Sequence, residues 1–402
     1  NLLVAQSGGP TSAINATLAG VVENALSSPS VDRIYGSING IQGVLTENLI
    51  DLKTKITNVS ELDLLCQTPA SALGSCRVKL KDPAVCADEY ETIISVLRKY
   101  NIDCFIYIGG NDSMDTVDKL SKYLNAKGIT DITVVGAPKT IDNDLCGTDH
   151  CPGFGSAAKY IGTTFAELER DCYVYATKAV TIVEVMGRDA GWLTAASCLA
   201  RAKGPDFIYL CEVPFSIDTF LKDVKAKLEE QDAVIIAVSE GVKNKDGRYI
   251  SEEVQSSAVD SFGHSYIAGA AKVLEDAVRN EIGCKVRSIE LNLMQRCAAH
   301  LASATDIQES RMLGKTACQY ALGGATGMMA AVIRTSDKPY ATEFKALPVC
   351  DIANAIKSVP ADYINDAGND VTEKMVDYLT PLIQGEMNTV YENGIPKYLY
   401  LY

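Results

Sequence analysis

The chain has 402 residues, of which 47% are hydrophobic and 22% are charged, and its formal net charge is −14. Two or three domains of about 150 residues each fit this length, and the composition is that of a soluble globular protein. The negative charge argues against nucleic acid as a partner. No apolar run approaches the roughly 20 residues of a membrane span, so we expect no membrane association.

Short apolar runs alternate along the chain with amphipathic stretches. The runs predict buried strands at residues 2–5, 32–35, 104–108, 133–137, 181–185, 206–211, 233–238 and 328–333. The amphipathic stretches predict helices, among them residues 113–126, 216–230 and 266–282. Apolar strands spaced by helices are typical of parallel sheets covered on both faces. One small sheet cannot hold all these strands, so the sequence predicts an α/β fold with two Rossmann-like three-layer lobes and parallel-rich sheets.

The thirteen cysteines are scattered along the chain and form no Cys-x-x-Cys pair. Such a pattern favours reduced, mostly buried thiols over a disulfide framework or a metal site. We therefore expect a cytoplasmic location and no signal peptide.

The most informative segment is Pro-Lys-Thr-Ile-Asp-Asn-Asp at residues 138–144, which follows a predicted buried strand. Open α/β sheets bind their ligands at the carboxyl ends of the strands. Asp142 and Asp144 would face the same side of an extended loop, one as a base and the other as a metal ligand. Lys139 adds the cation that anionic phosphate chemistry requires. Taken alone, the segment could equally be a structural Asp-rich turn.

Three further loops follow predicted strands, and their composition suits phosphate. They lie at residues 7–11, 109–113 and 186–191. Their glycines would let backbone N–H groups approach a ligand next to a helix N-terminus. Each loop alone could also be a tight turn, a helix cap or a surface arginine.

Together, the four loops resemble those of the phosphofructokinase family, and the resemblance covers nearly the whole chain. The matching residues are Ser7-Gly8-Gly9 with Asn15, Leu73-Gly74-Ser75-Cys76-Arg77, the loop at 109–113, Thr140 to Asp144, Met186-Gly187-Arg188, Glu240 and Gln295-Arg296. The Thr-Ile-Asp-Asn-Asp and Met-Gly-Arg segments are specific, whereas the glycine pairs add little by themselves.

The resemblance implies phosphoryl transfer to the 1-hydroxyl of fructose 6-phosphate, giving fructose 1,6-bisphosphate, as in glycolysis and gluconeogenesis. It also implies two lobes that divide the substrates between them. We expect residues 1–150 plus about 295–345 to form the phosphate-donor lobe. We expect about 151–294 plus 346–402 to form the sugar-phosphate lobe and a C-terminal extension, with the break at a Pro/Gly-containing turn near residues 151–155.

The resemblance further implies a role for individual residues. The catalytic residues would be Asp142 as general base, with Thr140, Lys139 and Arg188 around the transferred group. The donor would bind at Gly8, Gly9, Arg77, Asp112 and Ser113. The sugar phosphate would bind at Met186, Gly187, Glu240, Arg287 and Arg296. Magnesium (Mg2+) would bind at Asn111 and Asp144. Arg287 would reach the site of a neighbouring subunit, which implies a homodimer or homotetramer with shared active sites.

Two positions in the sequence indicate which phosphate donor the protein uses. Members of the family that use ATP carry glycine where this chain has Asp112 and Lys139. A carboxylate would block a nucleotide by bulk and charge, whereas a lysine can hold the small, highly charged pyrophosphate. Both residues are those of pyrophosphate-dependent members, whose reaction is expected to be reversible.

Three alternatives stay open at this point. The first is an ATP-dependent 6-phosphofructokinase of the same fold. The second is a non-catalytic regulatory subunit, because Asn111 stands where most members have a magnesium-binding aspartate. The third is an enzyme for another sugar phosphate, such as sedoheptulose 7-phosphate.

Overall fold

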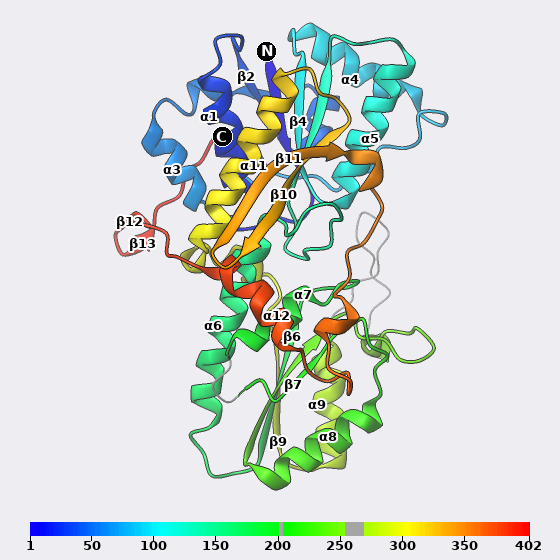
Figure 1. Ribbon diagram of the computed structural model, residues 1–402, viewed down its shortest axis with the longest axis vertical. Helices are drawn as coiled ribbons and strands as arrows, with labels where there is room; N and C mark the ends of the chain where they lie inside the picture. Colours follow the sequence, from blue (N-terminus) through cyan, green and yellow to red (C-terminus); the bar gives the residue numbers. More distant parts are fainter. Residues whose placement is uncertain (201–203, 254–268) are drawn as a thin grey trace.

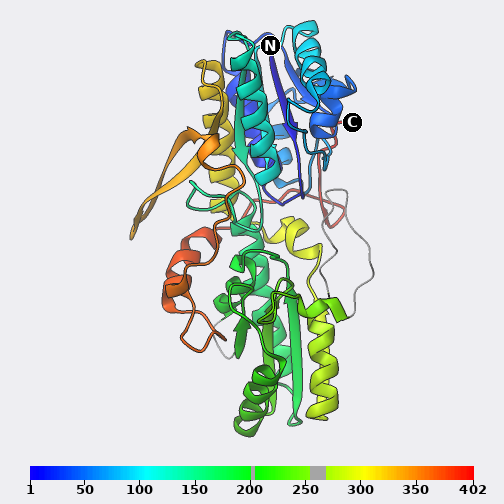
Figure 2. The same cartoon turned by 90° about the vertical axis from the view of Figure 1, so that its right-hand side faces the viewer.

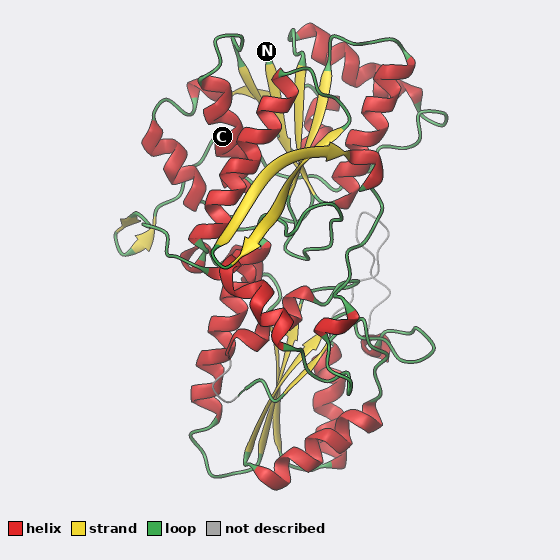
Figure 3. Cartoon of the chain, viewed as in Figure 1, coloured by secondary structure: helices red, strands yellow, loops and turns green. Residues whose placement is uncertain are grey.

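The computed structural model describes residues 1–200, 204–253 and 269–402. Two lobes lie one above the other, and each is a sheet between layers of helices (Figure 1). Both chain ends lie in the larger lobe. Figure 3 shows the strands at the centre of each lobe and the helices outside them. Within the described residues, no helix combines the length and apolar character needed to cross a membrane.

The larger lobe, as far as it is described, has a seven-stranded sheet of order β11-β10-β5-β4-β1-β2-β3. Its strands are β1 (Leu2–Gln6), β2 (Ile34–Ser37), β3 (Leu49–Asp51), β4 (Cys104–Gly109), β5 (Thr133–Pro138), β10 (Met328–Asp337) and β11 (Tyr340–Pro348). Strands β10 to β2 in this order are parallel, whereas β3 and β11 pair antiparallel at the two edges. The β10–β11 hairpin extends beyond the rest of the sheet (Figure 2).

Helices cover both faces of this sheet. They are α1 (Ile14–Leu26), α2 (Gly40–Leu45), α3 (Val59–Gln67), α4 (Ala87–Lys99), α5 (Asn111–Ala126) and α11 (Ala304–Leu322). Alternate residues of β1 pack into two different cores: Leu2 and Val4 face α1, α3 and α11, whereas Leu3 and Ala5 face α4 and α5. Burial on both faces explains why these strands are apolar runs without polar alternation.

The smaller lobe has a parallel sheet of order β7-β8-β6-β9 in the part that is described. Its strands are β6 (Ala179–Val185), β7 (Phe207–Tyr209), β8 (Ala233–Ser239) and β9 (Lys285–Glu290). Around them lie α6 (Phe154–Cys172), α7 (Trp192–Ala195), α8 (Ile217–Glu230), α9 (Ala270–Glu281), α10 (Met294–Cys297) and α12 (Glu373–Leu379). One core contains side chains of α6, α7 and α12, and the other contains side chains of α8 and α9.

The remaining elements are short. The 3₁₀ turns are Leu52–Thr54, Ala196–Ala200, Ile250–Glu253, Ala299–Leu301, Val349–Asp351, Ala361–Tyr363 and Thr380–Ile383, and a small ribbon is formed by β12 (Tyr391–Glu392) and β13 (Ile395–Pro396).

The predicted α/β fold class is confirmed, and each predicted strand overlaps an observed one. Strands β3, β9, β11, β12 and β13 were not predicted. In β9 the exposed edge alternates charged and apolar residues and gives no apolar run. The predicted helix at 266–282 corresponds to α9, which begins at Ala270, and residues 266–268 lie outside the described residues.

The segment beyond residue 348 contacts both lobes. Met375 and Leu379 of α12 are buried in a core of the smaller lobe, whereas Leu401 packs in a core of the larger one. Gln67 of α3 donates to the carbonyl groups of Val390 (3.0 Å) and Lys397 (2.6 Å). We expected the C-terminal extension to accompany the smaller lobe alone, and the structure divides it between the two. The expected assignment of one substrate to each lobe stays a prediction.

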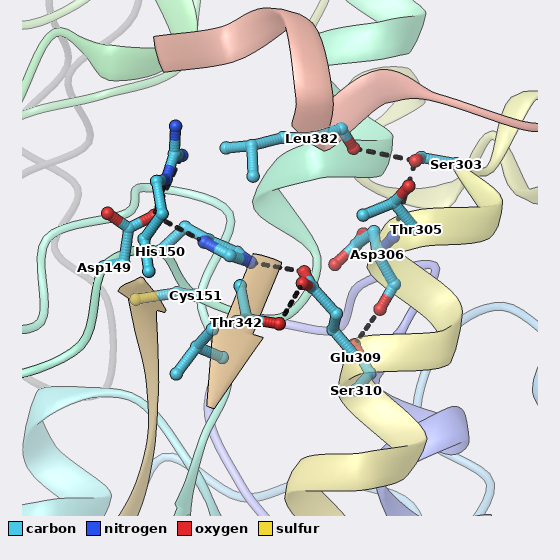
Figure 4. Close-up of polar contacts among 12 residues, drawn as sticks. Asp149, His150, Cys151, Ser303, Thr305, Asp306, Glu309, Ser310, Thr342 and Leu382 are labelled. Atoms are coloured by element: carbon cyan, nitrogen blue, oxygen red, sulfur yellow. Dashed lines mark hydrogen bonds and ion pairs between the residues drawn. The ribbon is translucent and has the colours of Figure 1, made fainter. Parts of the chain in front are cut away.

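A buried histidine anchors the loop between β5 and α6 (Figure 4). The Nδ1 atom of His150 lies 2.8 Å from Asp149 Oδ2, and its Nε2 atom lies 2.6 Å from Glu309 Oε2 on α11. Glu309 also accepts hydrogen bonds from Tyr340 and Thr342 of β11, at 2.8 and 3.0 Å. Burial disfavours a charged ring, but the hydrogen bonds to the two carboxylates raise the pKa of His150 to about 9. The imidazolium therefore ties this loop to α11 and to the hairpin.

This network predicts a pH dependence of stability. The pKa of His150 is about 9 in the folded protein and about 6.5 in an unfolded chain. Its stabilisation is therefore fully present below about pH 6.5 and is lost as the pH rises to about 9. Between about pH 6.5 and 9, we expect the free energy of unfolding of the wild type to fall by about 1–3 kcal/mol more than that of His150→Gln. Urea unfolding measures this difference. His300→Gln, at an exposed turn, should keep the wild-type slope, and equal slopes for both variants would contradict the prediction.

Candidate active site

A pocket of about 490 Å³ lies between the two lobes, at the carboxyl ends of β1, β4, β5 and β6. It is lined by three stretches and several single positions, namely 7–11, Arg77, 110–113, 139–142, Asp144, Met186, Arg188, Asp189, Glu240, Arg296, Asn354 and Ile356. All the predicted site residues except Gly187 and Arg287 are among them. Parallel strands bring these loops to one edge because their carboxyl ends point the same way.

The two glycines of the first loop lie close to Lys139 and Arg296. Gly8 has φ +77°, in the left-handed region, and a Cβ there would lie 3.2 Å from the Lys139 Nζ atom. Lys139 donates a hydrogen bond to the carbonyl group of Gly9. A Cβ on Gly9 would lie 3.4 Å from an Nη atom of Arg296. Glycine is thus needed at position 8 both for its backbone conformation and for the approach of Lys139.

Asp142 and Asp144 both line the pocket, but the loop between them is not extended. Asn143 has φ +55°, so the chain turns there and the expectation of an extended loop was wrong. Thr140 Oγ1 accepts a hydrogen bond from the Asp142 backbone N–H at 3.1 Å. Burial raises the pKa of Asp142, and the charge of Asp144 raises it further, against the opposing effect of Lys139. Burial also raises the pKa of Asp144.

Asn111 and Asp144 offer a place for a cation. The Asn111 Nδ2 group donates to Asp144 Oδ2 at 3.3 Å. The Oδ1 atoms of both residues are buried and have no hydrogen-bond partner among the described residues. Two oxygen acceptors that lack donors fit a hard divalent cation such as Mg2+. The described residues contain no group of three or more His, Cys, Asp or Glu side chains arranged to hold a metal ion, so further ligands would have to be water or substrate oxygens.

Cations surround the carboxylate pair. Lys139 is 2% exposed, and burial lowers its pKa to about 8, against the opposing charge of Asp142. Arg188 and Arg296 line the pocket from the smaller lobe and from the segment before α11. The site therefore presents local positive charge in a protein whose net charge is −14.

Asp112 has a partner that sequence reasoning missed. Its carboxylate forms an ion pair with Lys79 Nζ at 3.0 Å, and both side chains are partly exposed. Lys79 lies two positions after Arg77, the last residue of the matched Leu73–Arg77 segment. This closeness in sequence was the available sign that Lys79 lies near the site. The pair holds the carboxylate at the rim of the pocket, at the first turn of α5.

The side of the pocket formed by the smaller lobe contains a half-buried acid, Glu240. Burial raises the pKa of Glu240 to about 8, and the Gly187 backbone N–H donates to its Oε1 atom at 3.2 Å. Gly187 has φ +130°, and a Cβ there would lie 2.5 Å from the Ala190 carbonyl oxygen. Gly187 therefore shapes the loop around Glu240 and does not itself line the pocket.

Arg287 lies on β9, the exposed edge strand of the smaller sheet, and outside the pocket of its own chain. Its predicted role in the site of a neighbouring subunit stays a prediction. Asn354 and Ile356 do line the pocket. The sequence offers no motif for these two residues, because they come from an irregular segment far along the chain.

The family model for phosphofructokinase matches residues 1–321 of the chain. The chain belongs to the phosphofructokinase family. The pyrophosphate--fructose 6-phosphate 1-phosphotransferase of Xanthomonas campestris is 41% identical over 408 residues, covering 100% of this chain and 96% of the relative. The resemblance inferred from the four loops is confirmed.

Solved phosphofructokinases share the fold over the full chain. The pyrophosphate-dependent phosphofructokinase of Nitrosospira multiformis is 36% identical, with a TM-score of 0.88, and covers 100% of this chain and 96% of its own. The pyrophosphate-dependent phosphofructokinase of Marinobacter aquaeolei is also 36% identical, with a TM-score of 0.87, and the match covers 99% and 95% of the two chains. Both structures include the segment beyond residue 321, where the family model ends.

Proposed function

We propose that this phosphofructokinase transfers a phosphoryl group from pyrophosphate to the 1-hydroxyl of fructose 6-phosphate, and that it also runs the reverse reaction. The observation that carries the proposal is that Lys139 and Asp112 both line the pocket that contains the half-buried Asp142. The 41% identity to a relative named for this reaction supports the same donor.

Asp142 is the general base in this proposal. The 1-hydroxyl oxygen attacks a phosphorus atom of pyrophosphate, the bond to the bridging oxygen breaks, and orthophosphate leaves. The hydroxyl proton passes to Asp142. Its pKa is raised by burial, which makes it a better base than an exposed aspartate, and such catalysis typically contributes about 10²- to 10⁴-fold in rate. Thr140 bonds the Asp142 backbone and so orients the base, and its place in the pocket wall lets it contact the transferred group.

The cations bind the donor and counter the charge of the transition state. Lys139 and Arg77 bind pyrophosphate together with Gly8, Gly9 and Ser113, because all five line the pocket. Arg188 lies across the pocket and stabilises the charge on the transferred group. Asp112, held by Lys79, excludes the larger and more extended nucleotide.

The sugar phosphate binds on the side of the smaller lobe. Arg296 binds its 6-phosphate, and Met186 and Glu240 contact the sugar, with Gly187 holding the loop. Burial raises the pKa of Glu240 to about 8, so this side chain can donate as well as accept a hydrogen bond. Arg287 of a neighbouring subunit completes the 6-phosphate site in a homodimer or homotetramer, which its exposed place on β9 allows.

Asn111 and Asp144 hold Mg2+ in this proposal, because their Oδ1 atoms lack donors. Bound Mg2+ would neutralise pyrophosphate charge and polarise the transferred phosphoryl group. We also propose a cytoplasmic location. All thirteen cysteines fall within the described residues and are thiols rather than disulfides, which fits a reducing compartment.

The donor is tested by measuring fructose 1,6-bisphosphate production with Mg2+ and either pyrophosphate or ATP. We expect turnover with pyrophosphate and at least about 100-fold less with ATP, since the Asp112 carboxylate repels the nucleotide phosphates. Replacing both Asp112 and Lys139 by glycine should raise turnover with ATP relative to turnover with pyrophosphate. A preference of the wild type for ATP would contradict the proposed donor.

The base is tested by Asp142→Asn, which keeps the size of the side chain and removes the proton acceptor. We expect kcat to fall by about 10²- to 10⁴-fold with little change in KM for either substrate. Asp246→Asn, in an exposed loop, is the control and should retain wild-type kcat. A fall of less than about tenfold for Asp142→Asn would assign the base to another group.

The metal site is tested without turnover. Added Mg2+ should raise the Tm of the wild-type protein, because a ligand that binds the folded state stabilises it. Asn111→Asp adds a negative charge, so the Mg2+ concentration that gives half of the Tm increase should fall by several fold. Asp144→Asn should abolish the Tm increase. NaCl at equal ionic strength is the control. Equal Mg2+ responses of wild type and Asp144→Asn would place the ion elsewhere.

A further inference from the structure

Asn143 forms the turn between the two active-site carboxylates, and its side chain does not line the pocket. It is fully buried and has a left-handed backbone with φ +55°. Its Nδ2 group donates to Tyr378 Oη at 2.8 Å. Its Oδ1 atom accepts from the Cys151 backbone N–H at 3.0 Å and from Lys357 Nζ at 3.4 Å. The turn is therefore held from behind by residues far away in the sequence.

Tyr378 of α12 bonds the loop at two points. Its hydroxyl accepts from Asn143 and donates to the Asp149 carbonyl oxygen at 2.7 Å. Its ring packs on Trp192, with 5.1 Å between ring centroids, and the Arg334 guanidinium lies 4.7 Å from its centre. These contacts leave the phenol little freedom, so the hydroxyl has a defined position against the loop.

Lys357 bonds the same loop at four points. Its backbone N–H donates to the Asp144 carbonyl oxygen at 2.8 Å. Its Nζ group donates to Asn143 Oδ1 and to the carbonyl oxygens of Thr148 (3.2 Å) and Asp149 (2.8 Å). The Trp192 indole N–H donates to the Lys357 carbonyl oxygen at 2.8 Å, which fixes Lys357 on the smaller lobe.

We propose that Lys357 and Tyr378 are positioning residues of this enzyme, which hold the Asn143 turn so that Asp142 and Asp144 face the pocket. The inference rests on the proposed function. A left-handed backbone is uncommon for residues other than glycine, so the hydrogen bonds of the Asn143 side chain help this turn to persist. Both partners lie beyond residue 321, where the family model ends. The C-terminal segment thus belongs to the catalytic apparatus and not only to the scaffold.

The geometry also predicts what the two residues do not do. Neither lines the pocket, so neither should contribute to substrate binding. A displacement of a catalytic group by about 1 Å can cost about 10²-fold in rate. Their loss should therefore lower kcat and leave KM nearly unchanged.

The test compares Tyr378→Phe and Lys357→Met with two matched controls. Tyr209→Phe, on β7, removes the hydroxyl of a buried tyrosine that bonds Asp223 and does not touch the loop. Lys159→Met removes an ammonium group that bonds the Gly385 carbonyl oxygen. We expect Tyr378→Phe and Lys357→Met to lower kcat by about 5- to 50-fold, with KM for fructose 6-phosphate and pyrophosphate within about twofold of wild type. The controls should keep kcat within about twofold.

Hydrogen exchange of residues 140–145, measured without substrate or Mg2+, provides a readout apart from activity. The backbone amides there should exchange faster in Tyr378→Phe and Lys357→Met than in the two controls, at equal global stability in urea. Equal exchange and equal kcat in Tyr378→Phe and Tyr209→Phe would overturn the positioning role. A wild type without pyrophosphate turnover would overturn the proposed function instead, and loop exchange alone would then decide whether the two residues hold the turn.

Discussion

Two neighbouring carboxylates, Asp142 and Asp144, are held in a pocket between the lobes that binds strongly anionic substrates in the function proposed here. Burial raises the pKa of both, and the charge of Asp144 further opposes the ionisation of Asp142. Such a pair is tolerated only where cations and hydrogen-bond donors surround it. Lys139 and Arg188 stand on the pocket side, and Lys357 stands behind the loop. Most other features of the site follow from the need to place these cations around one turn.

The parallel sheets meet this need by topology. Strands β1, β4 and β5 of the larger sheet and β6 of the smaller one end at the same pocket. Every loop that leaves these ends therefore presents its residues to one volume. The glycines and helix N-termini there supply backbone N–H groups, which attract phosphate without adding side-chain charge. A protein of net charge −14 can in this way keep a locally positive site.

Contacts from α11, the β10–β11 hairpin and the C-terminal segment hold the loop between β5 and α6 in place. His150 links that loop to α11 and the β10–β11 hairpin through Glu309, and Arg334 of the hairpin binds Asp149 at 2.9 Å. Tyr378 and Lys357 bond the same loop close to the carboxylates. Elements that lie far beyond the catalytic motif thus decide how firmly it is held, and the solved relatives retain this region in full-length matches.

The sequence by itself determined the fold class, the strands that are buried on both faces, the four loops of the pocket and the nature of its charged groups. These properties are local, because an apolar run or a Thr-Ile-Asp-Asn-Asp segment carries its signal within a few adjacent residues. The tertiary structure alone decided the left-handed turn at Asn143, the ion pair of Asp112 with Lys79, and the entry of Asn354 and Ile356 into the pocket wall. Each depends on groups that are far apart in the sequence and that only folding brings together. Local periodicity and composition carry no information about such contacts.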